Sequence, residues 1–322
     1  MKLKMMYTFL NTDIALIEKE LEQRIETKEA LITNASLHLL QAGGKRIRPV
    51  FVLLAGKFGS YDINQIKHVA VALELIHMAS LVHDDVIDDA DMRRGKPTIK
   101  AKWDNRIAMY TGDYIFARAL ETITKIEQVD AHKILSDTMV ELTLGEIEQI
   151  KDKYDLNQDL RTYLRRIKRK TALLIAASCQ LGAIAAGAPE SIHKKLFLFG
   201  YYVGMSFQIT DDILDFTSSE EKLGKPVGSD LLQGNITLPV LYALEDPNFR
   251  LKVEKLFVAD DQTELISEII TYITTSSNVI DRSVEVSERY LEKAMMILKE
   301  LPDNKARKAL YQIAKYIGKR KF

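Results

Sequence analysis

The segment IKHVAVALELIHMASLVHDDVIDD, residues 66–89, decides the fold class of this chain. Up to Met78 its apolar side chains recur at spacings of three and four residues, which is the period of a helix with one buried face. The same spacing covers residues 135–150 and most of the remaining sequence. Only 15 Gly and 7 Pro occur in 322 residues, so helices are rarely interrupted, and alternating strand patterns are hard to find. The sequence therefore predicts an all-α fold with roughly ten or more helices.

Few positions interrupt this helical pattern. Gly43-Gly44 and Pro49 do so early, Pro189 divides two helices, and the polar residues 217–234 are the longest expected loop. The charge-free residues 172–189 are mostly Ala and fall short of the roughly 20 strongly apolar residues that a membrane span needs. We expect a buried core helix there. No repeat, low-complexity tract or linker divides the chain, so we expect a single helical domain over residues 1–322.

The composition excludes several classes of protein. With 47% hydrophobic and 28% charged residues, the chain is neither disordered nor fibrous. Its 45 Lys and Arg balance 45 Asp and Glu, which argues against a dedicated nucleic-acid or membrane-surface binder. The one cysteine, Cys179, excludes a disulfide within the chain, argues against a thiolate zinc site and is interpreted as a core residue. The N-terminus has no secretory signal, so we expect a cytoplasmic protein.

Three carboxylates gather at the end of the segment 66–89. In a helix Asp84 and Asp88 are four residues apart and share a face, with Asp85 beside them. Such crowded carboxylates repel one another, so the arrangement makes sense if a cation lies between them, and oxygen ligands favour Mg²⁺ over Zn²⁺. Arg93 and Arg94 follow at once, and a metal cluster next to two arginines suits a phosphate ester.

The same spacing occurs again at Asp211, Asp212 and Asp215. Taken alone, one such motif is equally well explained as a solvated acidic helix face. Both motifs, however, follow apolar helical segments, residues 79–82 and 203–207, so their acidic ends should line the mouth of a buried cavity. Two such clusters on separate helices could clamp one diphosphate through bridging Mg²⁺.

The segment GGKRIRP, residues 43–49, places positive charge next to two glycines. Glycines let the backbone approach an anion closely, and Lys45 and Arg48 supply the charge. The segment is not a P-loop, because GxxxxGK[ST] is absent, and by itself it is better explained as a solvated basic loop. Together with Arg94 it predicts a second diphosphate site that uses side-chain cations in place of metal.

The remaining candidates are each weak alone. Their ordinary explanations are a charged helix end, a satisfied core amide, a polar loop and a structural histidine. They are Lys170 and Thr171 before the alanine-rich helix, Gln208 one turn before Asp212, Lys225 within GKPVGSD, and His77 two turns before Asp84.

The chain resembles the trans-polyprenyl diphosphate synthase family in the order and spacing of five elements: GGKRIRP, HMASLVHDDVIDDADMRRGKPT, Lys170-Thr171, FQITDDILD and GKPVGSDL. This resemblance covers nearly the whole chain. It implies helices around a deep central cavity, with the two acidic helices facing each other. It also implies an Mg²⁺-dependent prenyltransferase that condenses isopentenyl diphosphate with an allylic diphosphate, farnesyl diphosphate or longer.

The resemblance also implies a role for each matching residue. Asp84, Asp85, Asp88, Asp211, Asp212 and Asp215 would bind Mg²⁺, Arg93, Lys170 and Lys225 the allylic diphosphate, and Lys45, Arg48, His77 and Arg94 isopentenyl diphosphate; Thr171 and Gln208 would lie near the reacting carbon. Asp84, Asp88, Arg93, Lys170 and Asp211 would carry catalysis. One departure is Asn235, since many relatives have a lysine before the Thr-Leu-Pro element that also meets the allylic diphosphate.

Product length is the last implication. In short-chain members of the family the positions five and four before the first Asp form the cavity floor, often with aromatic residues, and here they are Ala79 and Ser80. Both are small, so we expect a product longer than farnesyl diphosphate. The resemblance is to the subclass that makes heptaprenyl diphosphate for menaquinone and requires a smaller, non-homologous subunit (component 1), with a homodimer as the state of the chain alone.

Three alternatives stay open. The product could instead be geranylgeranyl, hexaprenyl or octaprenyl diphosphate. The chain could be a class I terpene cyclase or a head-to-head condensing enzyme, although these enzymes need no metal-free diphosphate site and cyclases typically carry an NSE-type motif that we do not find. It could also be a non-catalytic helical scaffold, although nothing structural requires six crowded carboxylates.

Overall fold

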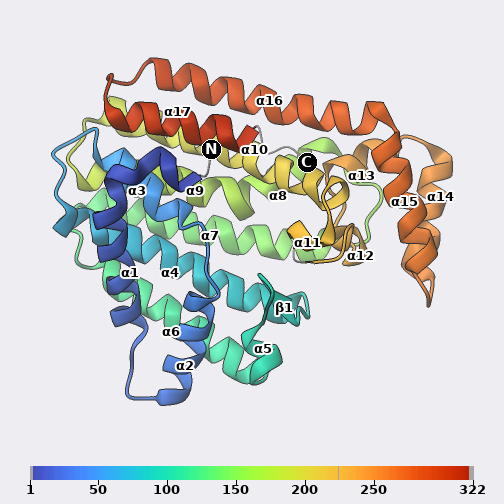
Figure 1. Ribbon diagram of the computed structural model, residues 1–322, viewed down its shortest axis with the longest axis horizontal. Coiled ribbons are helices and arrows are strands. Elements are labelled where there is room, and N and C mark those ends of the chain that lie inside the picture. Colours follow the sequence, from blue (N-terminus) through green and yellow to red (C-terminus); the bar gives the residue numbers. More distant parts are fainter. Residues whose placement is uncertain (1–2, 224, 319–322) are drawn as a thin grey trace. The chain divides into compact units, whose positions relative to one another are not determined.

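The computed structural model describes residues 3–223 and 225–318, and nearly all of its regular structure is helical, as expected (Figure 1). The elements are η1 Leu3–Leu10, α1 Asn11–Ile25, α2 Ala30–Gln41, α3 Ile47–Gly56, α4 Ile63–Ile87, β1 Met92–Arg93, β2 Lys96–Pro97, α5 Ile99–Lys102, α6 Asn105–Ile123, α7 Val129–Asp152, α8 Leu160–Ile167, η2 Lys168–Ala172, α9 Leu173–Ala185, α10 Glu190–Thr217, α11 Glu220–Leu223, α12 Ser229–Leu232, α13 Leu238–Ala243, α14 Pro247–Val258, α15 Thr263–Thr275, α16 Ser277–Lys299 and α17 Lys305–Gly318. The all-α prediction is confirmed.

Two details differ from the sequence expectation. The expected loop 217–234 contains the single-turn helices α11 and α12, which are too short to show a helical period. A small antiparallel hairpin, β1–β2, pairs Arg93 with Lys96. Its turn residues, Arg94 and Gly95, both have positive φ (53° and 74°), as a type I′ turn requires. Strands of two residues are too short to show alternation.

The chain divides into two compact units. Unit 1 takes the described residues up to Asp137, together with Leu174–Gly200 and Ile297–Ile313. Unit 2 takes Thr138–Leu173, Tyr201–Met296 and the described residues from Ala314 onward. The expectation of one domain over residues 1–322 stays a prediction, and so does the central cavity.

The core of unit 1 is built around α4, which packs along α6, α3 and α1 (Figure 1). Asp62 begins α4 by accepting a hydrogen bond from the backbone N–H of Asn64 (2.9 Å). The helix α9 fulfils the expectation of a buried alanine-rich helix, and Cys179 lies fully buried in it. A Cβ on Gly182 of α9 would lie 2.3 Å from the carbonyl oxygen of Val52, so only glycine allows α9 to approach α3 this closely.

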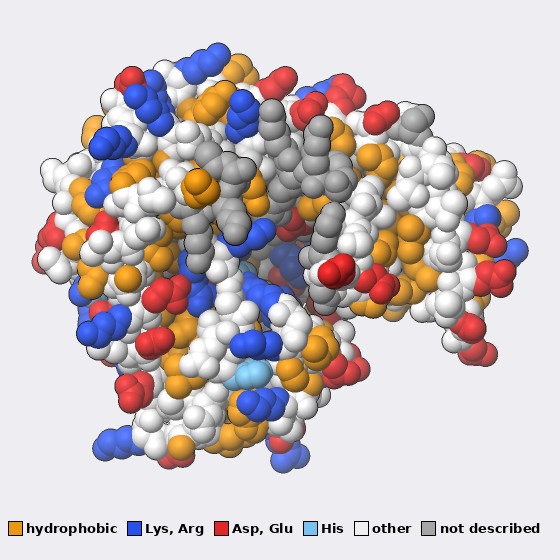
Figure 2. Space-filling model, in the orientation of Figure 1, with side chains coloured by type: hydrophobic (Ala, Val, Ile, Leu, Met, Phe, Trp, Pro, Cys, Tyr) orange, Lys and Arg blue, Asp and Glu red, His pale blue; other side chains and the backbone are white. Residues whose placement is uncertain are grey.

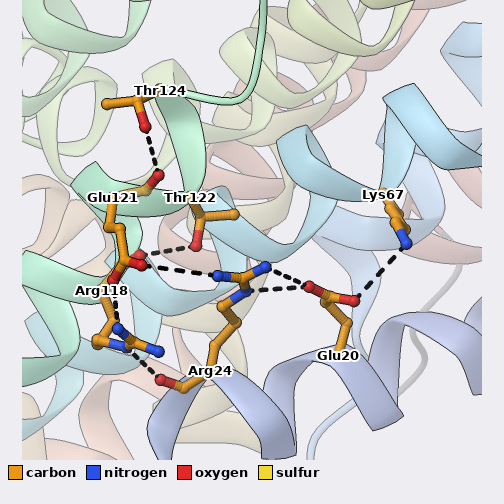
Figure 3. A network of polar contacts seen from close by, with 7 residues as sticks. All are labelled: Glu20, Arg24, Lys67, Arg118, Glu121, Thr122 and Thr124. Atoms are coloured by element: carbon orange, nitrogen blue, oxygen red, sulfur yellow. Dashed lines mark hydrogen bonds and ion pairs between the residues drawn. The ribbon is translucent and has the colours of Figure 1, made fainter.

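A network of polar contacts joins α1, α4 and α6 on the outside of this core (Figure 3). Glu20 accepts two hydrogen bonds from Arg24 (2.9 and 2.7 Å) and pairs with Lys67 of α4 (3.7 Å). Arg118 of α6 donates to the backbone oxygen of Arg24 (2.5 Å) and also pairs with Glu121. The network therefore fixes α1 against α4 and α6, the two helices that pack most extensively in unit 1.

Unit 2 has two apolar clusters. One gathers side chains of α12 to α15, among them Phe249, Val253 and Ile269. The other joins α8, α10 and α13 through Tyr163, Ile213 and Leu238. The second cluster contacts the second acidic motif, because Tyr163 donates a hydrogen bond to Asp212 of α10 (2.7 Å).

The surface carries both signs of charge. On the face shown in Figure 2, Lys and Arg side chains are interspersed with Asp and Glu. Among the described residues, no helix is both long enough and apolar enough to cross a membrane.

Candidate active site

The first acidic cluster lies where α4 ends. Asp84 and Asp85 are in its last turn, and Asp88 is the C-cap, whose N–H donates to the Asp84 carbonyl (2.8 Å). The C-terminal end of a helix is its negative end, so three carboxylates there are unfavourable unless cations balance them. One such cation is Arg93, which lies 2.7 Å from the buried Asp85 carboxylate. Burial nevertheless raises the pKa of Asp85, with Arg93 acting in the opposite direction.

The β1–β2 hairpin brings the two arginines to different partners. Arg93 extends to Asp85, whereas Arg94, in the turn, donates to the carbonyl of Gly43. Lys96 holds the same loop by donating to the carbonyl of Gln41 (2.9 Å). The hairpin thus links the acidic cluster to the segment GGKRIRP, as a site for a charged ligand requires.

The glycines of this segment let the backbone lie close to the side chain of Arg94. Gly43 has φ +83°, and a Cβ on Gly44 would lie 2.8 Å from Nη1 of Arg94. Lys45 is exposed beside them, and Arg46 adopts a left-handed conformation (φ 47°) as the N-cap of α3. A non-glycine residue with positive φ marks a backbone position that its surroundings hold in place.

Four arginines, Arg46, Arg48, Arg93 and Arg94, form a basic cluster whose charge acts on His77 of α4. Burial lowers the pKa of His77 well below its usual value, and Arg48, Arg94, Arg93 and Arg46 lower it further. The imidazole is therefore neutral at physiological pH and can donate one hydrogen bond without adding charge. Guanidinium groups beside a neutral hydrogen-bond donor can bind an anion without a metal.

Unit 2 holds the second acidic cluster, near the end of α10. Asp212 is buried, and its two oxygens accept hydrogen bonds from Tyr163 Oη (2.7 Å) and Gln208 Nε2 (2.8 Å). Thr171 in turn donates to Gln208 Oε1 (2.7 Å). Burial, followed by the negative charge of Asp230, raises the pKa of Asp212 to about 7.

Lys225 balances the negative charge of Asp215, the next carboxylate of this cluster. Lys225 Nζ lies 2.8 Å from the buried Asp215 and 2.7 Å from Asp230. Burial and Asp230 raise the pKa of Asp215, against the effect of Lys225. Ser229, the first residue of α12, completes the arrangement, since its hydroxyl donates to Asp215 Oδ1 (3.2 Å). Lys225 therefore lies between two carboxylates, where a bound cation or a ligand anion would change its contacts.

Lys170 and Thr171 lie in η2, a π-helical turn that connects α8 to α9. Such turns are rare and occur frequently at functional sites. Lys170 lies 2.9 Å from Glu146 of α7. Gly145 permits this contact between helices, because a Cβ there would lie 2.7 Å from the Cβ of Arg169.

The structure thus brings the candidates together in two groups, one in each unit. Unit 1 holds the first acidic cluster with the basic residues, and unit 2 holds the second acidic cluster with Lys170, Thr171, Gln208 and Lys225. The chain-length candidates lie one turn before Asp84: Ala79 is fully buried, and Ser80 donates to the carbonyl of His77 (2.9 Å).

Sequence reasoning missed four residues of these groups. Asp230 lies within the quoted GKPVGSD but received no role, and Arg46 lies within GGKRIRP. Tyr163 and Glu74 occupy ordinary positions in helical patterns, and nothing local in the sequence distinguishes them. Asn235, which replaces the lysine of many relatives, is fixed by a backbone hydrogen bond: its N–H donates to the carbonyl of Asp230 (2.9 Å).

The donor chemistry of both clusters fits a divalent cation. Among the described residues, no group of three or more His, Cys, Asp or Glu is arranged to enclose an ion. Each cluster nevertheless offers only oxygen donors, lies near a helix C-terminus and contains a buried carboxylate whose pKa is raised. These are the features that a hard divalent cation would stabilise.

Comparisons with known proteins agree with this chemistry. A family model described as Polyprenyl synthetase matches residues 29–273. Over 322 residues the chain is 67% identical to heptaprenyl diphosphate synthase component 2 of Bacillus subtilis, covering 100% of this chain and 92% of that protein. It is 63% identical to the component 2 of Geobacillus stearothermophilus, covering 100% of both chains.

Two solved structures share the fold. Heptaprenyl diphosphate synthase from Staphylococcus aureus matches with a TM-score of 0.92 and 47% identity, over 97% of this chain and 98% of that one. A polyprenyl synthase from Caulobacter crescentus, complexed with calcium and isoprenyl diphosphate, matches with a TM-score of 0.94 and 30% identity, over 99% and 98% of the two chains.

Proposed function

Since the chain belongs to the polyprenyl synthetase family and is a trans-prenyltransferase, we propose that it makes heptaprenyl diphosphate as the catalytic subunit of a two-component synthase. Its substrates would be isopentenyl diphosphate and an allylic diphosphate such as farnesyl diphosphate, and its product would supply the menaquinone side chain. The observation that carries the product assignment is the identity of 67% and 63% to two proteins of that name, over the full chain.

We assign the allylic diphosphate to the acidic clusters. Asp84, Asp85 and Asp88 with Asp211, Asp212 and Asp215 would hold Mg²⁺, which neutralises charge on the departing diphosphate when it is bound. Arg93, Lys170 and Lys225 are each paired with an acidic side chain. When the diphosphate binds, they would exchange these carboxylate partners for diphosphate oxygens. Thr171 and Gln208, joined by a hydrogen bond, would lie near the reacting carbon.

We assign isopentenyl diphosphate to the basic cluster, without metal. Lys45, Arg48 and Arg94 supply charge, and the neutral His77 supplies a hydrogen bond. The carbon–oxygen bond of the allylic diphosphate breaks, and the alkene of isopentenyl diphosphate attacks the resulting allylic cation. A proton is then lost to the released diphosphate, and the new allylic product can react again.

The small residues Ala79 and Ser80 support a long product. Neither side chain is large enough to block a growing apolar chain one turn before Asp84. Replacing Ala79 by Phe would place a ring at this position, which should shorten the product.

A partner subunit is supported by an apolar face of α7. Val140, Leu144 and Ile147 recur at spacings of four and three and are all exposed. This spacing places them on one face of the helix. Exposed apolar residues in such a row are typical of an interface, and the smaller subunit implied by the component 2 relatives is the partner that we propose.

The test is reconstitution. The chain, with component 1 of a close relative, Mg²⁺ and farnesyl diphosphate, should consume isopentenyl diphosphate and give a C35 product on chromatography. Asp84→Asn should abolish turnover, whereas Asp260→Asn, at an exposed loop position, should not. Consumption of farnesyl diphosphate alone would indicate a cyclase, and full turnover by Asp84→Asn would refute the site.

A further inference from the structure

The basic cluster contains one buried carboxylate to which the proposed reaction gives no role. Glu74 lies on α4, one turn before His77, and only 3% of it is exposed. A buried glutamate is rare unless it is paired, because removing its charge from water is costly. One oxygen, Oε1, accepts from Arg46 Nη1 at 3.1 Å. The other, Oε2, is buried and has no hydrogen-bond partner among the residues that the structure describes.

Arg46 is fully engaged by the protein itself. Its Nε lies 2.6 Å from Glu18, and its Nη2 donates to the carbonyl of Leu40 (2.9 Å). The side chain therefore points between Glu18 and Glu74 and fixes the loop that carries Lys45. Arg46 is for this reason a positioning residue and not a ligand of the substrate.

Arg48 is in the opposite situation. Its Nε is buried and lacks a hydrogen-bond partner within the described ranges. Burial and the nearby Arg94 lower the pKa of Arg48 to about 10, and Glu74 is the group that acts against them. Glu74 likewise raises the pKa of Arg94 against burial and the neighbouring Arg93. The guanidinium groups thus share one buried counter-charge.

We propose that Glu74 is the resident counter-charge of the basic cluster, holding Arg46 with one oxygen and balancing Arg48 and Arg94 until a diphosphate binds. Like charges at close range in a partly buried site repel strongly. Glu74 relieves this repulsion in the ligand-free protein and so stabilises it. The negative charge of Glu74 also opposes the incoming anion, which lowers the affinity of the cluster for diphosphate and lets the ligand dissociate.

The proposal rests on the assignment of a diphosphate to this cluster, and one experiment separates the two. Binding of inorganic diphosphate is measured by calorimetry in a chelator, so that the acidic clusters, which need a divalent cation, do not contribute. Glu74→Gln keeps the shape and the hydrogen bond to Arg46 but removes the charge. We expect it to bind diphosphate about five- to tenfold more tightly than wild type. We also expect a lower Tm without ligand and a larger rise in Tm on adding diphosphate.

Two further variants make the result specific. Glu18→Gln removes the other carboxylate partner of Arg46, away from Arg48, and should lower the Tm with unchanged affinity. Glu74→Asp keeps the charge but shortens the reach to Arg46, so we expect wild-type affinity. Binding by Glu74→Asp as tight as that by Glu74→Gln would show that the charge of Glu74 does not oppose the anion, and would overturn the proposal.

The remaining outcomes distinguish the assignment of the diphosphate site from the role of Glu74 within it. If wild type binds diphosphate and Arg48→Met does not, the site is correct. If in that case Glu74→Gln binds no more tightly than wild type, the counter-charge role is wrong while the site stands. If wild type binds no diphosphate in the chelator, the assignment of the site is wrong, and the role of Glu74 is wrong with it.

Discussion

Replacing Asp212 by Asn should change how stability depends on pH. Asp212 is buried, and burial together with Asp230 raises its pKa from 3.8 to about 7. Between these two values the folded protein binds the proton more tightly than the unfolded chain, so stability is fully present at low pH and falls as the pH rises. The difference between a pKa of 3.8 in the unfolded chain and about 7 in the folded protein corresponds to about 4 kcal/mol, of which about 2.5 kcal/mol is lost between pH 5 and pH 8.

The substitution preserves the local contacts. The amide introduced by Asp212→Asn can accept the hydrogen bond from Gln208 and donate to the hydroxyl of Tyr163, because a tyrosine hydroxyl accepts as well as donates. The free energy of unfolding in urea is measured from pH 5 to pH 8 in a chelator. The difference between Asp212→Asn and wild type should change by about 2.5 kcal/mol across this range, in favour of the variant at pH 8.

A matched control removes a carboxylate that is exposed. Glu264→Gln, on the surface of α15, should follow the wild-type curve. Equal pH dependence of wild type and Asp212→Asn would refute the reasoning, since it would mean that the burial of Asp212 does not set its pKa. Mg²⁺ gives a second readout: because it binds ionised carboxylates, it should stabilise wild type more at pH 8 than at pH 5, and the variant less.

Two further substitutions test packing and positioning. Tyr163→Phe keeps the buried ring but removes the donor to Asp212, so unfolding at pH 8 should require about 1–3 kcal/mol less. Half-maximal activity should also require more Mg²⁺, while the exposed Tyr311→Phe should change neither quantity. Gly182→Ala places a methyl group 2.3 Å from the carbonyl oxygen of Val52, and the free energy of unfolding should fall by about 1–3 kcal/mol because neither helix can move away. A wild-type Tm for this variant would show that the approach of α9 to α3 is less tight than described.

Local patterns determined the helices and the composition of the site. The spacing of apolar residues in 66–89 predicted α4, and Pro189 marked the boundary between α9 and α10. The two acidic motifs follow from the helix period as well, since residues four apart on a helix share a face. The prediction of a basic segment at GGKRIRP needed only the residue types, and Gly43 has a positive φ of 83°.

Only the tertiary structure decided which of these groups hold one another. Tyr163 and Asp212 are 49 positions apart, and Arg46 and Glu74 are 28 apart, so no local period connects them. The π-helical turn at Lys168–Ala172 and the pairing of Lys225 with Asp215 have no sequence signal either. A helix period specifies which side chains share a face, but burial depends on what packs against that face from elsewhere in the chain. Burial is also what raises the pKa of Asp212 and leaves Glu74 as the buried counter-charge, and for this reason the electrostatics of the site could not be derived from sequence.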